Sequence, residues 1–214
     1  MKVFIAIPCL ETVPALFCQS LALLQRAGDT MVGFEMGSLV YEARNRLARQ
    51  AIKSEADYVL WLDSDMVFSP DFLQRMMTVS KENDIDFLTA VCFRRKPPYT
   101  PTLFDRLEKT DAGASYTALM SVPDGRFTVG ACGFAGVLMT TDVLMSVAAS
   151  NSGRMFDPIK GMGEDVSFCW RARQCGYDIW CNSSLEMGHV GTFVVTREFF
   201  EAYSEKGVKD GPLG

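Results

Sequence analysis

The stretch "DYVLWLDSDMVFSPDFL", residues 57–73, passes from an apolar run to two carboxylates and back to an apolar pattern. Its first part predicts a buried strand, because a short apolar run bounded by polar residues is typical of one. Ser69 and Pro70 predict the N-cap and the first position of a helix. Asp63 and Asp65 are therefore expected at the carboxyl end of a buried strand, just before a helix.

Strand-like and helix-like segments alternate on both sides of this stretch. Ser38 is the predicted N-cap of one helix, and Gly28 and Gly176 are predicted to end two others. The alternation predicts an α/β fold with a largely parallel sheet and helices on both faces. The expected strands are 2–8, 30–36, 57–63, 84–93 and 177–184, the expected helices are 13–28, 39–56, 69–83, 164–176 and 197–207, and residues 133–147 form a further strand and helix.

Composition indicates a globular protein with one domain, residues 1–214. The chain is 48% hydrophobic and 22% charged, and an α/β domain of this length buries a core without disulfides or metals. The regular pattern ends at Phe93, and residues 94–132, rich in Pro, Gly and Thr, are expected to be irregular. A net charge of -5, with no basic run longer than residues 94–96, argues against a nucleic-acid partner.

No stretch approaches the roughly 18 apolar residues that a membrane span needs, so no integral membrane segment is expected. Residues 1–10 fit a first strand better than a signal peptide. The seven cysteines are scattered without a CxxC pair. Cys92, Cys132 and Cys169 lie in apolar patterns, as buried reduced thiols do, which predicts a cytoplasmic protein.

Asp63 and Asp65 have the spacing that points two side chains of an extended segment the same way. Open parallel sheets bind ligands at the carboxyl ends of their strands, where these two carboxylates are expected. A divalent cation, Mg²⁺ or Mn²⁺, would remove their mutual repulsion. The alternative is a polar Asp-Ser-Asp turn without a ligand.

The segment "GMGEDVSFCW", residues 161–170, places Glu164 and Asp165 at the start of a predicted helix. Acidic residues there are favoured by the helix dipole alone, which is the simpler interpretation. Gly161 and Gly163, however, make a flexible loop that approaches closely. A carboxylate at a helix N-terminus is expected to stay ionised and could accept a proton from a hydroxyl group.

His189 is the only histidine and lies between Gly188 and Gly191, just beyond the last predicted strand. A single histidine is often structural. Glycines on both sides leave its ring room to reach a ligand, however, and imidazole with two carboxylates would make a plausible Mn²⁺ site.

Arg44 falls on the apolar stripe of the helix predicted over residues 39–56, together with Val40 and Leu47. A charge on an apolar face needs a partner. The interpretations left open are an internal ion pair and a guanidinium directed at a carboxylate or phosphate near the strand ends.

The ordered set of motifs resembles the nucleotide-sugar glycosyltransferases of the GT-A fold, especially the family 2-like bacterial and phage enzymes. The motifs are "IAIPCLE" (5–11), "EARNRL" (42–47), "WLDSDM" (61–66), "GFAGVLM" (133–139), "GEDVSF" (163–168) and "GHVG" (188–191). The resemblance covers residues 3 to about 191. It implies a Rossmann-like sheet and transfer of a sugar from a nucleoside-diphosphate sugar, UDP favoured and GDP next, to a hydroxyl acceptor.

The resemblance also implies a role for each matched residue. The implied nucleotide- and donor-binding residues are Pro8, Cys9, Glu11, Arg44, Asn45, Asp63, Ser64, Gly133 and Gly136. The implied metal ligands are Asp65, Asp63 and His189, with Mn²⁺ or Mg²⁺ as the ion, and the implied catalytic residues are Asp165 and Glu164. Asp165 would be the base of an inverting enzyme, and residues 1–93 and 94–214 would be the nucleotide half and the donor-sugar and acceptor half.

Other functions share acidic motifs of this kind. A haloacid-dehalogenase-type phosphatase would carry its DxD on the first strand, and a nucleotidyltransferase would open with a Gly-rich basic loop; neither is seen here. A non-catalytic nucleotide- or carbohydrate-binding module is the remaining alternative. The donor sugar, the acceptor (a glycan, a lipid-linked group or a protein) and the oligomeric state stay open.

Overall fold

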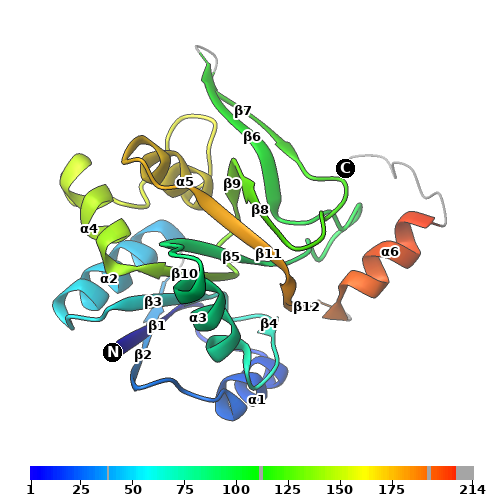
Figure 1. The fold of residues 1–214 in the computed structure, drawn as a ribbon, viewed down its shortest axis with the longest axis horizontal. Coiled ribbons are helices and arrows are strands. Elements are labelled where there is room, and N and C mark those ends of the chain that lie inside the picture. The colour runs from blue at the N-terminus through cyan, green and yellow to red at the C-terminus, as the bar shows by residue number, and fades with distance from the viewer. Residues whose placement is uncertain (38, 111–112, 192–193, 206–214) are drawn as a thin grey trace.

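The computed structural model describes residues 1–37, 39–110, 113–191 and 194–205, and its strands and helices alternate along the first half of the chain (Figure 1). The strands are β1 (Lys2–Cys9), β2 (Asp29–Met36), β3 (Tyr58–Leu62), β4 (Met66–Val67), β5 (Phe87–Val91), β6 (Leu103–Thr110), β7 (Gly113–Ala118), β8 (Arg126–Val129), β9 (Ala131–Cys132), β10 (Gly136–Thr140), β11 (Ile179–Glu186), β12 (Gly188–Val190) and β13 (Val194–Val195). The helices are α1 (Ala15–Leu23), α2 (Val40–Lys53), α3 (Phe72–Glu82), α4 (Thr141–Ser150), α5 (Glu164–Gln174) and α6 (Arg197–Glu205).

The central sheet has seven strands in the order β2-β1-β3-β10-β5-β11-β8. β1 pairs in parallel with β2 and β3, and β11 pairs in parallel with β5. β10 is antiparallel to both of its neighbours, and β8 is antiparallel to β11. The predicted α/β fold is confirmed, and five of these strands run the same way. β10 is reversed because strands β6 to β9, rather than a helical crossover, connect it to β5.

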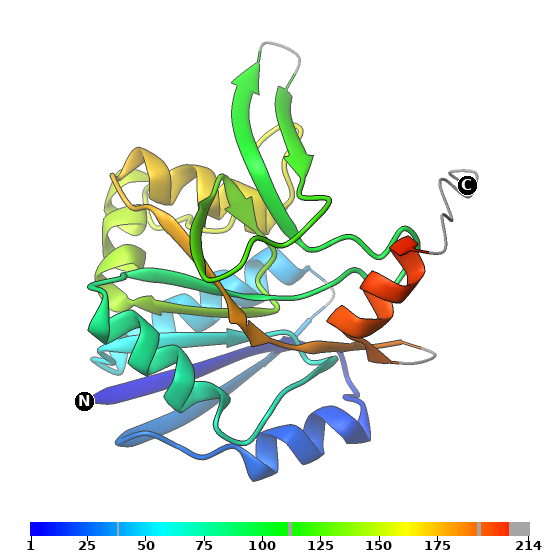
Figure 2. The same ribbon diagram turned by 45° about the vertical axis from the view of Figure 1, so that its right-hand side comes forward.

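Side chains of β3 alternate between two apolar cores. Val59 and Trp61 pack in the core that contains residues of α2, α4 and α5, whereas Leu60 and Leu62 pack in the core that contains residues of α1 and α3. A strand buried on both faces reads as a continuous apolar run, which is why the sequence shows no alternation there. The helices therefore cover both faces of the sheet (Figures 1 and 2).

Several helix boundaries differ from the prediction, among them the end of α1 and the start of α3. α1 ends at Leu23, and Gly28 instead has a φ of 60° in the turn that leads into β2. α3 begins at Phe72, because Ser69 and Asp71 form a turn in which the Ser69 hydroxyl donates to the Asp71 carboxylate over 2.5 Å. The predicted N-cap Ser38 lies outside the described residues.

Residues 94–132 are more regular than the sequence predicts. β6 and β7 form an antiparallel hairpin that projects from the body of the molecule (Figure 2). α6 packs on the segment that follows β5, with the rings of Phe93 and Phe200 stacked 5.0 Å apart. Cys92, Cys132 and Cys169 are buried free thiols, as predicted. None of the described helices has the length and apolar character needed to cross a membrane.

Candidate functional site

A small sheet brings Asp65 and His189 together. β12 pairs antiparallel with β4, so that His189 lies opposite Met66, the residue after Asp65. The backbone N–H of Val190 also donates to the carbonyl oxygen of Asp65 over 2.8 Å. As a result His189 Nε2 is 3.2 Å from Asp65 Oδ2, although the two residues are 124 positions apart in sequence.

The ring of His189 has a defined orientation. Its Nδ1 lies 2.8 Å from the carbonyl oxygen of Phe93, which can only accept, so Nδ1 carries a proton and donates. Neutral His189 then presents the lone pair of Nε2 to a carboxylate oxygen. Two acceptors at this distance need a proton or a cation between them. Metal-binding histidines are held in this way through their other nitrogen, so the pair fits a divalent cation.

The pKa values of the pair agree with this arrangement. Burial alone would lower the pKa of His189, but the contact with Asp65 and the hydrogen bond to Phe93 outweigh it, and the pKa is raised. Burial alone would raise the pKa of Asp65, but the contacts with His189 and Arg95 outweigh it, and the pKa is lowered. Both shifts show that Asp65 is stabilised in its ionised form by positive charge at His189 and Arg95.

Asp63 is paired with Arg44. Arg44 Nη2 donates to Asp63 Oδ1 over 2.8 Å, and Arg44 Nε lies 3.5 Å from Glu164 Oε1. Within the part of the chain that the structure describes, no three His, Cys, Asp or Glu side chains are grouped to hold a metal ion. Asp65 and His189 are therefore brought together, and Asp63 is not brought to them.

Arg44 is 2% exposed and links two acidic side chains of the site. Its guanidinium lies 5.8 Å from the ring centre of Trp61 and 5.3 Å from that of Phe134, so aromatic faces contribute to holding its charge. Among the described residues, its Nε and Nη1 atoms have no hydrogen-bond partner. The structure shows Arg44 in an internal ion pair, and because its partner Asp63 is itself a carboxylate at the end of β3, both interpretations left open by the sequence are compatible with it.

Two adjoining cavities collect most of the predicted site residues. The first, of about 260 Å³, is lined by Pro8, Cys9, Leu10, Gly37, Val40, Arg44, Asp63, Ser64, Asp65 and Glu164. The second, of about 200 Å³, is lined by Arg44, Asp63, Cys92, Arg94, Thr102, Phe104, Gly133, Phe134, Ala135, Glu164, Asp165 and His189. Both are bounded by Arg44, Asp63 and Glu164. Glu11 lines a separate outer cavity of about 710 Å³ with Leu10 and Gly37.

Asp165 lies on the wall of the second cavity, at the start of α5. Its Oδ1 accepts a hydrogen bond of 2.7 Å from its neighbour Val166 N–H, and a Cβ added to Gly133 would be 3.8 Å from its Oδ2. Burial, with the nearby charge of Glu164, raises the pKa of Asp165 from 3.8 to about 6. The pKa is raised because burial and Glu164 outweigh the hydrogen bond from Val166 and the charge of Arg44, but a carboxyl group with this pKa is still ionised at neutral pH and able to accept a proton.

Comparison with known proteins is consistent with this site. The model of the family described as "Glycosyltransferase like family 2" matches residues 29–210. The chain belongs to the glycosyltransferase-like family 2. This membership favours a glycosyltransferase over the phosphatase and nucleotidyltransferase alternatives, and the family implies a nucleotide-sugar donor and typically a metal ion.

The fold is also found in a solved structure. The crystal structure of A197 from STIV superposes with a TM-score of 0.63 at 17% sequence identity, over 89% of this chain and 85% of that chain. This likeness shows a shared fold, and the mixed seven-stranded sheet of this family 2 glycosyltransferase is consistent with the GT-A fold. No curated protein sequence matches the chain.

Two predicted donor-binding residues of this glycosyltransferase lie outside the cavities. Asn45 Oδ1 accepts from the N–H groups of Met155 and Phe156, each over 3.0 Å, and its Nδ2 donates to Asp157 Oδ1 over 2.7 Å. Gly136 is a packing position, because an added Cβ would be 2.1 Å from the sulfur of Met187. Asn45 therefore holds the loop before α5, and Gly136 allows β10 to pack closely.

Sequence reasoning missed two arginines that the structure places at the site. Arg95 Nη1 lies 2.8 Å from Asp65 Oδ2, and Arg94 lines the second cavity. Both directly follow the strand predicted over residues 84–93. The sequence feature that could have identified them is their place at the carboxyl end of a strand, where a parallel sheet binds ligands. As a basic run they were too short to suggest any partner.

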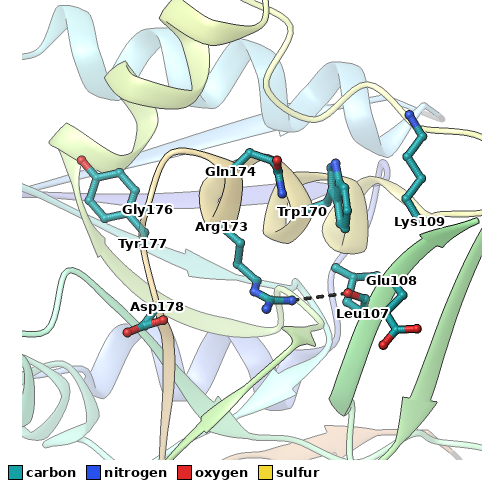
Figure 3. Close-up of a pocket in the computed structure, with 9 residues that line it drawn as sticks. All are labelled: Leu107, Glu108, Lys109, Trp170, Arg173, Gln174, Gly176, Tyr177 and Asp178. Carbon is teal, nitrogen blue, oxygen red and sulfur yellow. Dashed lines mark hydrogen bonds between the residues drawn. The ribbon is translucent and has the colours of Figure 1, made fainter.

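A further cavity, of about 510 Å³, lies between α5 and β6 and contains none of the predicted site residues (Figure 3). It is lined by Leu107, Glu108, Lys109, Trp170, Arg173, Gln174, Gly176, Tyr177 and Asp178. Arg173 reaches across it from α5, and its Nη1 donates to the carbonyl oxygen of Leu107 over 3.5 Å (Figure 3). No lining residue is common to this cavity and the two that contain Asp63.

Proposed function

We propose that the protein is a metal-dependent, inverting glycosyltransferase that moves a sugar from a nucleoside-diphosphate sugar to a hydroxyl acceptor. UDP is the favoured nucleotide and GDP the next. The observation that supports this most is that Asp165, a carboxyl group with a pKa of about 6, lines the same cavity as His189, the partner of Asp65. Sugar transfer from a diphosphate requires a proton acceptor and a cation-binding pair close together, and His189 connects the two, since it lines the cavity of Asp165 and contacts Asp65.

The nucleotide is proposed to lie in the first cavity, against Pro8, Cys9 and Ser64, with its base toward the outer cavity at Glu11. Asp65 and His189 would hold Mn²⁺ or Mg²⁺. Bound there, the ion would supply positive charge for the diphosphate that leaves. Asp63, fixed by Arg44, is proposed to face the ribose, since its oxygen Oδ1 is already used by the guanidinium.

Asp165 is the proposed base. Its carboxylate takes the proton from the acceptor hydroxyl as that oxygen attacks the anomeric carbon of the donor. The bond between the anomeric carbon and the phosphate oxygen breaks, and its electron pair stays on the diphosphate. Asp165 then releases the proton to solvent. A base with a pKa near neutrality is ionised at neutral pH and still has a useful affinity for the proton.

Glu164 and Arg44 are proposed to position the site rather than to react. Arg44 lies between the carboxylates of Asp63 and Glu164, so it fixes one group on the donor side and one beside Asp165. Gly133 packs closely on Thr102, since an added Cβ would be 3.2 Å from Thr102 Cβ, and the same Cβ would be 3.8 Å from Asp165 Oδ2. This packing would define the wall against which the donor sugar lies.

The proposed organisation is one catalytic domain, residues 1–214, in which 1–93 bind the nucleotide and 94–214 contact the donor sugar and the acceptor. The acceptor is proposed to be a glycan, a lipid-linked group or a protein, and the compartment the cytoplasm. Buried free thiols at Cys92, Cys132 and Cys169 support a reducing compartment.

The experiment is donor hydrolysis, because water can take the place of the unidentified acceptor. Wild-type protein is incubated with UDP- and GDP-sugars and Mn²⁺, and the anomeric configuration of the released sugar is followed by proton NMR. Asp165→Asn should keep donor binding and lose turnover, whereas Asp178→Asn, which removes an exposed carboxylate elsewhere, should keep both. Release with retained configuration, or full turnover by Asp165→Asn, would contradict inversion with Asp165 as base.

A further inference from the structure

Arg95 occupies the oxygen of Asp65 that a metal ion would use. Arg95 Nη1 is 2.8 Å from Asp65 Oδ2, and His189 Nε2 faces the same oxygen at 3.2 Å. The guanidinium therefore supplies positive charge beside the Asp65 carboxylate. The proposed function gives Arg95 no role, and sequence reasoning did not identify it.

We propose that Arg95 is an internal counter-ion of the donor site: it neutralises Asp65 while the site is empty, and it moves to the donor's diphosphate when a divalent cation takes Asp65. This inference rests on the proposed function, since it names what holds the diphosphate of the same donor. It assigns to Arg95 the phosphate contact that sequence reasoning gave to Arg44, which the structure shows buried between Asp63 and Glu164.

The side chain of Arg95 is free to move while its backbone is held. The side chain is 54% exposed. Arg94 N–H donates to the carbonyl oxygen of Thr100 over 3.0 Å, and Tyr99 N–H donates to that of Lys96 over 2.9 Å. The loop is thus closed on itself, and only the long Arg95 side chain needs to change its rotamers.

Charge gives the movement its direction. A divalent cation on Asp65 repels a guanidinium at the same oxygen, whereas the diphosphate attracts it. Arginine also suits the new partner, because its planar fork can donate two hydrogen bonds to phosphate oxygens. Arg94, which lines the second cavity, adds a further positive charge on the same side.

The exchange makes two opposite predictions for one substitution. In the nucleotide-free protein Arg95 competes with the metal, so Arg95→Met should tighten Mn²⁺ binding several-fold. In the presence of saturating Mn²⁺ Arg95 holds the diphosphate, so the same variant should bind UDP or GDP roughly tenfold more weakly, the size expected for losing a charge-assisted hydrogen bond. A residue that only stabilised the loop would not change the two affinities in opposite directions.

The test is calorimetric titration of the full chain, first with MnCl₂ alone and then with UDP and GDP at saturating Mn²⁺. Lys96→Met is the matched control, because Lys96 is the exposed neighbour of Arg95 and carries the same charge. The inference is supported if Arg95→Met tightens Mn²⁺ and weakens the nucleotide while Lys96→Met does neither. It is overturned if Arg95→Met behaves like Lys96→Met, or if both affinities move the same way.

Failure of the proposed function gives a different result. Wild-type protein that binds neither UDP nor GDP with Mn²⁺ would overturn the donor site itself, whatever the variants do. Wild-type protein that binds a nucleotide with Mn²⁺, together with an Arg95→Met variant of unchanged affinities, would overturn only the role of Arg95.

Discussion

Replacing Asp165 with asparagine should stabilise the protein at neutral pH while removing its activity. The pKa of Asp165 is raised from 3.8 to about 6, chiefly by burial. Between these two values the folded state holds a proton that the unfolded state has lost, so the stability of the wild type falls as the pH rises through this window. Asparagine keeps the acceptor for the hydrogen bond from Val166 and carries no charge to bury.

The magnitude follows from the shift. About 2.2 pKa units at about 1.4 kcal/mol each give a penalty of at most about 3 kcal/mol at pH 7.5, of which about 2 kcal/mol develops between pH 4.5 and 7.5. The free energy of unfolding is measured by urea denaturation of both proteins at these two pH values. The difference between Asp165→Asn and wild type should grow by about 2 kcal/mol in favour of the variant at pH 7.5.

The difference in free energy of unfolding between variant and wild type is compared at the two pH values. Contributions from the other titrating groups, which both proteins share, cancel in this comparison. A difference that is the same at both pH values would mean that the pKa of Asp165 is not raised. A wild type that gains stability over the variant as the pH rises would mean that it is lowered. Either result would remove the reason to consider Asp165 a base that works near neutrality.

Further predictions concern the residues that hold the site in place. Asn45→Ala should lower the free energy of unfolding by about 2–4 kcal/mol, because it leaves two backbone N–H groups of the loop before α5 without an acceptor. Its Mn²⁺-dependent affinity for the nucleotide, measured at a temperature where the variant is folded, should stay unchanged. Weaker nucleotide binding would return Asn45 to the donor site. Arg44→Met should lower the free energy of unfolding, measured by urea denaturation, by roughly 2–3 kcal/mol. This is less than the usual cost of breaking a buried ion pair, because the two carboxylate partners of Arg44 are partly exposed. An unchanged free energy of unfolding would mean that the ion pair does not contribute to stability.

Much of the fold follows from local sequence pattern. The apolar run of β3, the acidic pair after it and the helix that follows all come from residues 57–73. Gly176 ends α5 with a φ of 91°, as its position in the sequence predicts. These features depend on residues within a few positions of one another, so the sequence is sufficient to reveal them.

The arrangement of the second half depends on contacts that no local pattern contains. β10 inserts between β3 and β5 in the reverse direction, and β6 and β7 form a hairpin from a segment with many charged and small residues. Exposed on both sides over much of their length, these strands lack the apolar alternation that predicts a strand. The segment after α1 likewise has a distant partner, since Gln25 N–H donates to the Pro70 carbonyl.

The candidate site shows the same division. The sequence indicated that Arg44 needs a partner, but its partners Asp63 and Glu164 come from two other segments of the chain. Asn45 was placed beside the nucleotide because it follows Arg44, whereas on a helix adjacent residues point in different directions. Its side chain instead contacts a loop about 110 positions away.

The most direct test of the donor site is a thermal-shift measurement with UDP and GDP, each with and without Mn²⁺, on wild type, Asp65→Ala and the control Asp178→Ala. Ligand that binds only the folded state raises the melting temperature, so no acceptor is needed. We predict a rise with one nucleotide that requires Mn²⁺, persists in Asp178→Ala and is absent in Asp65→Ala. A rise that is equal without the metal, or that Asp65→Ala retains in full, would contradict a metal-dependent donor site at Asp65 and His189.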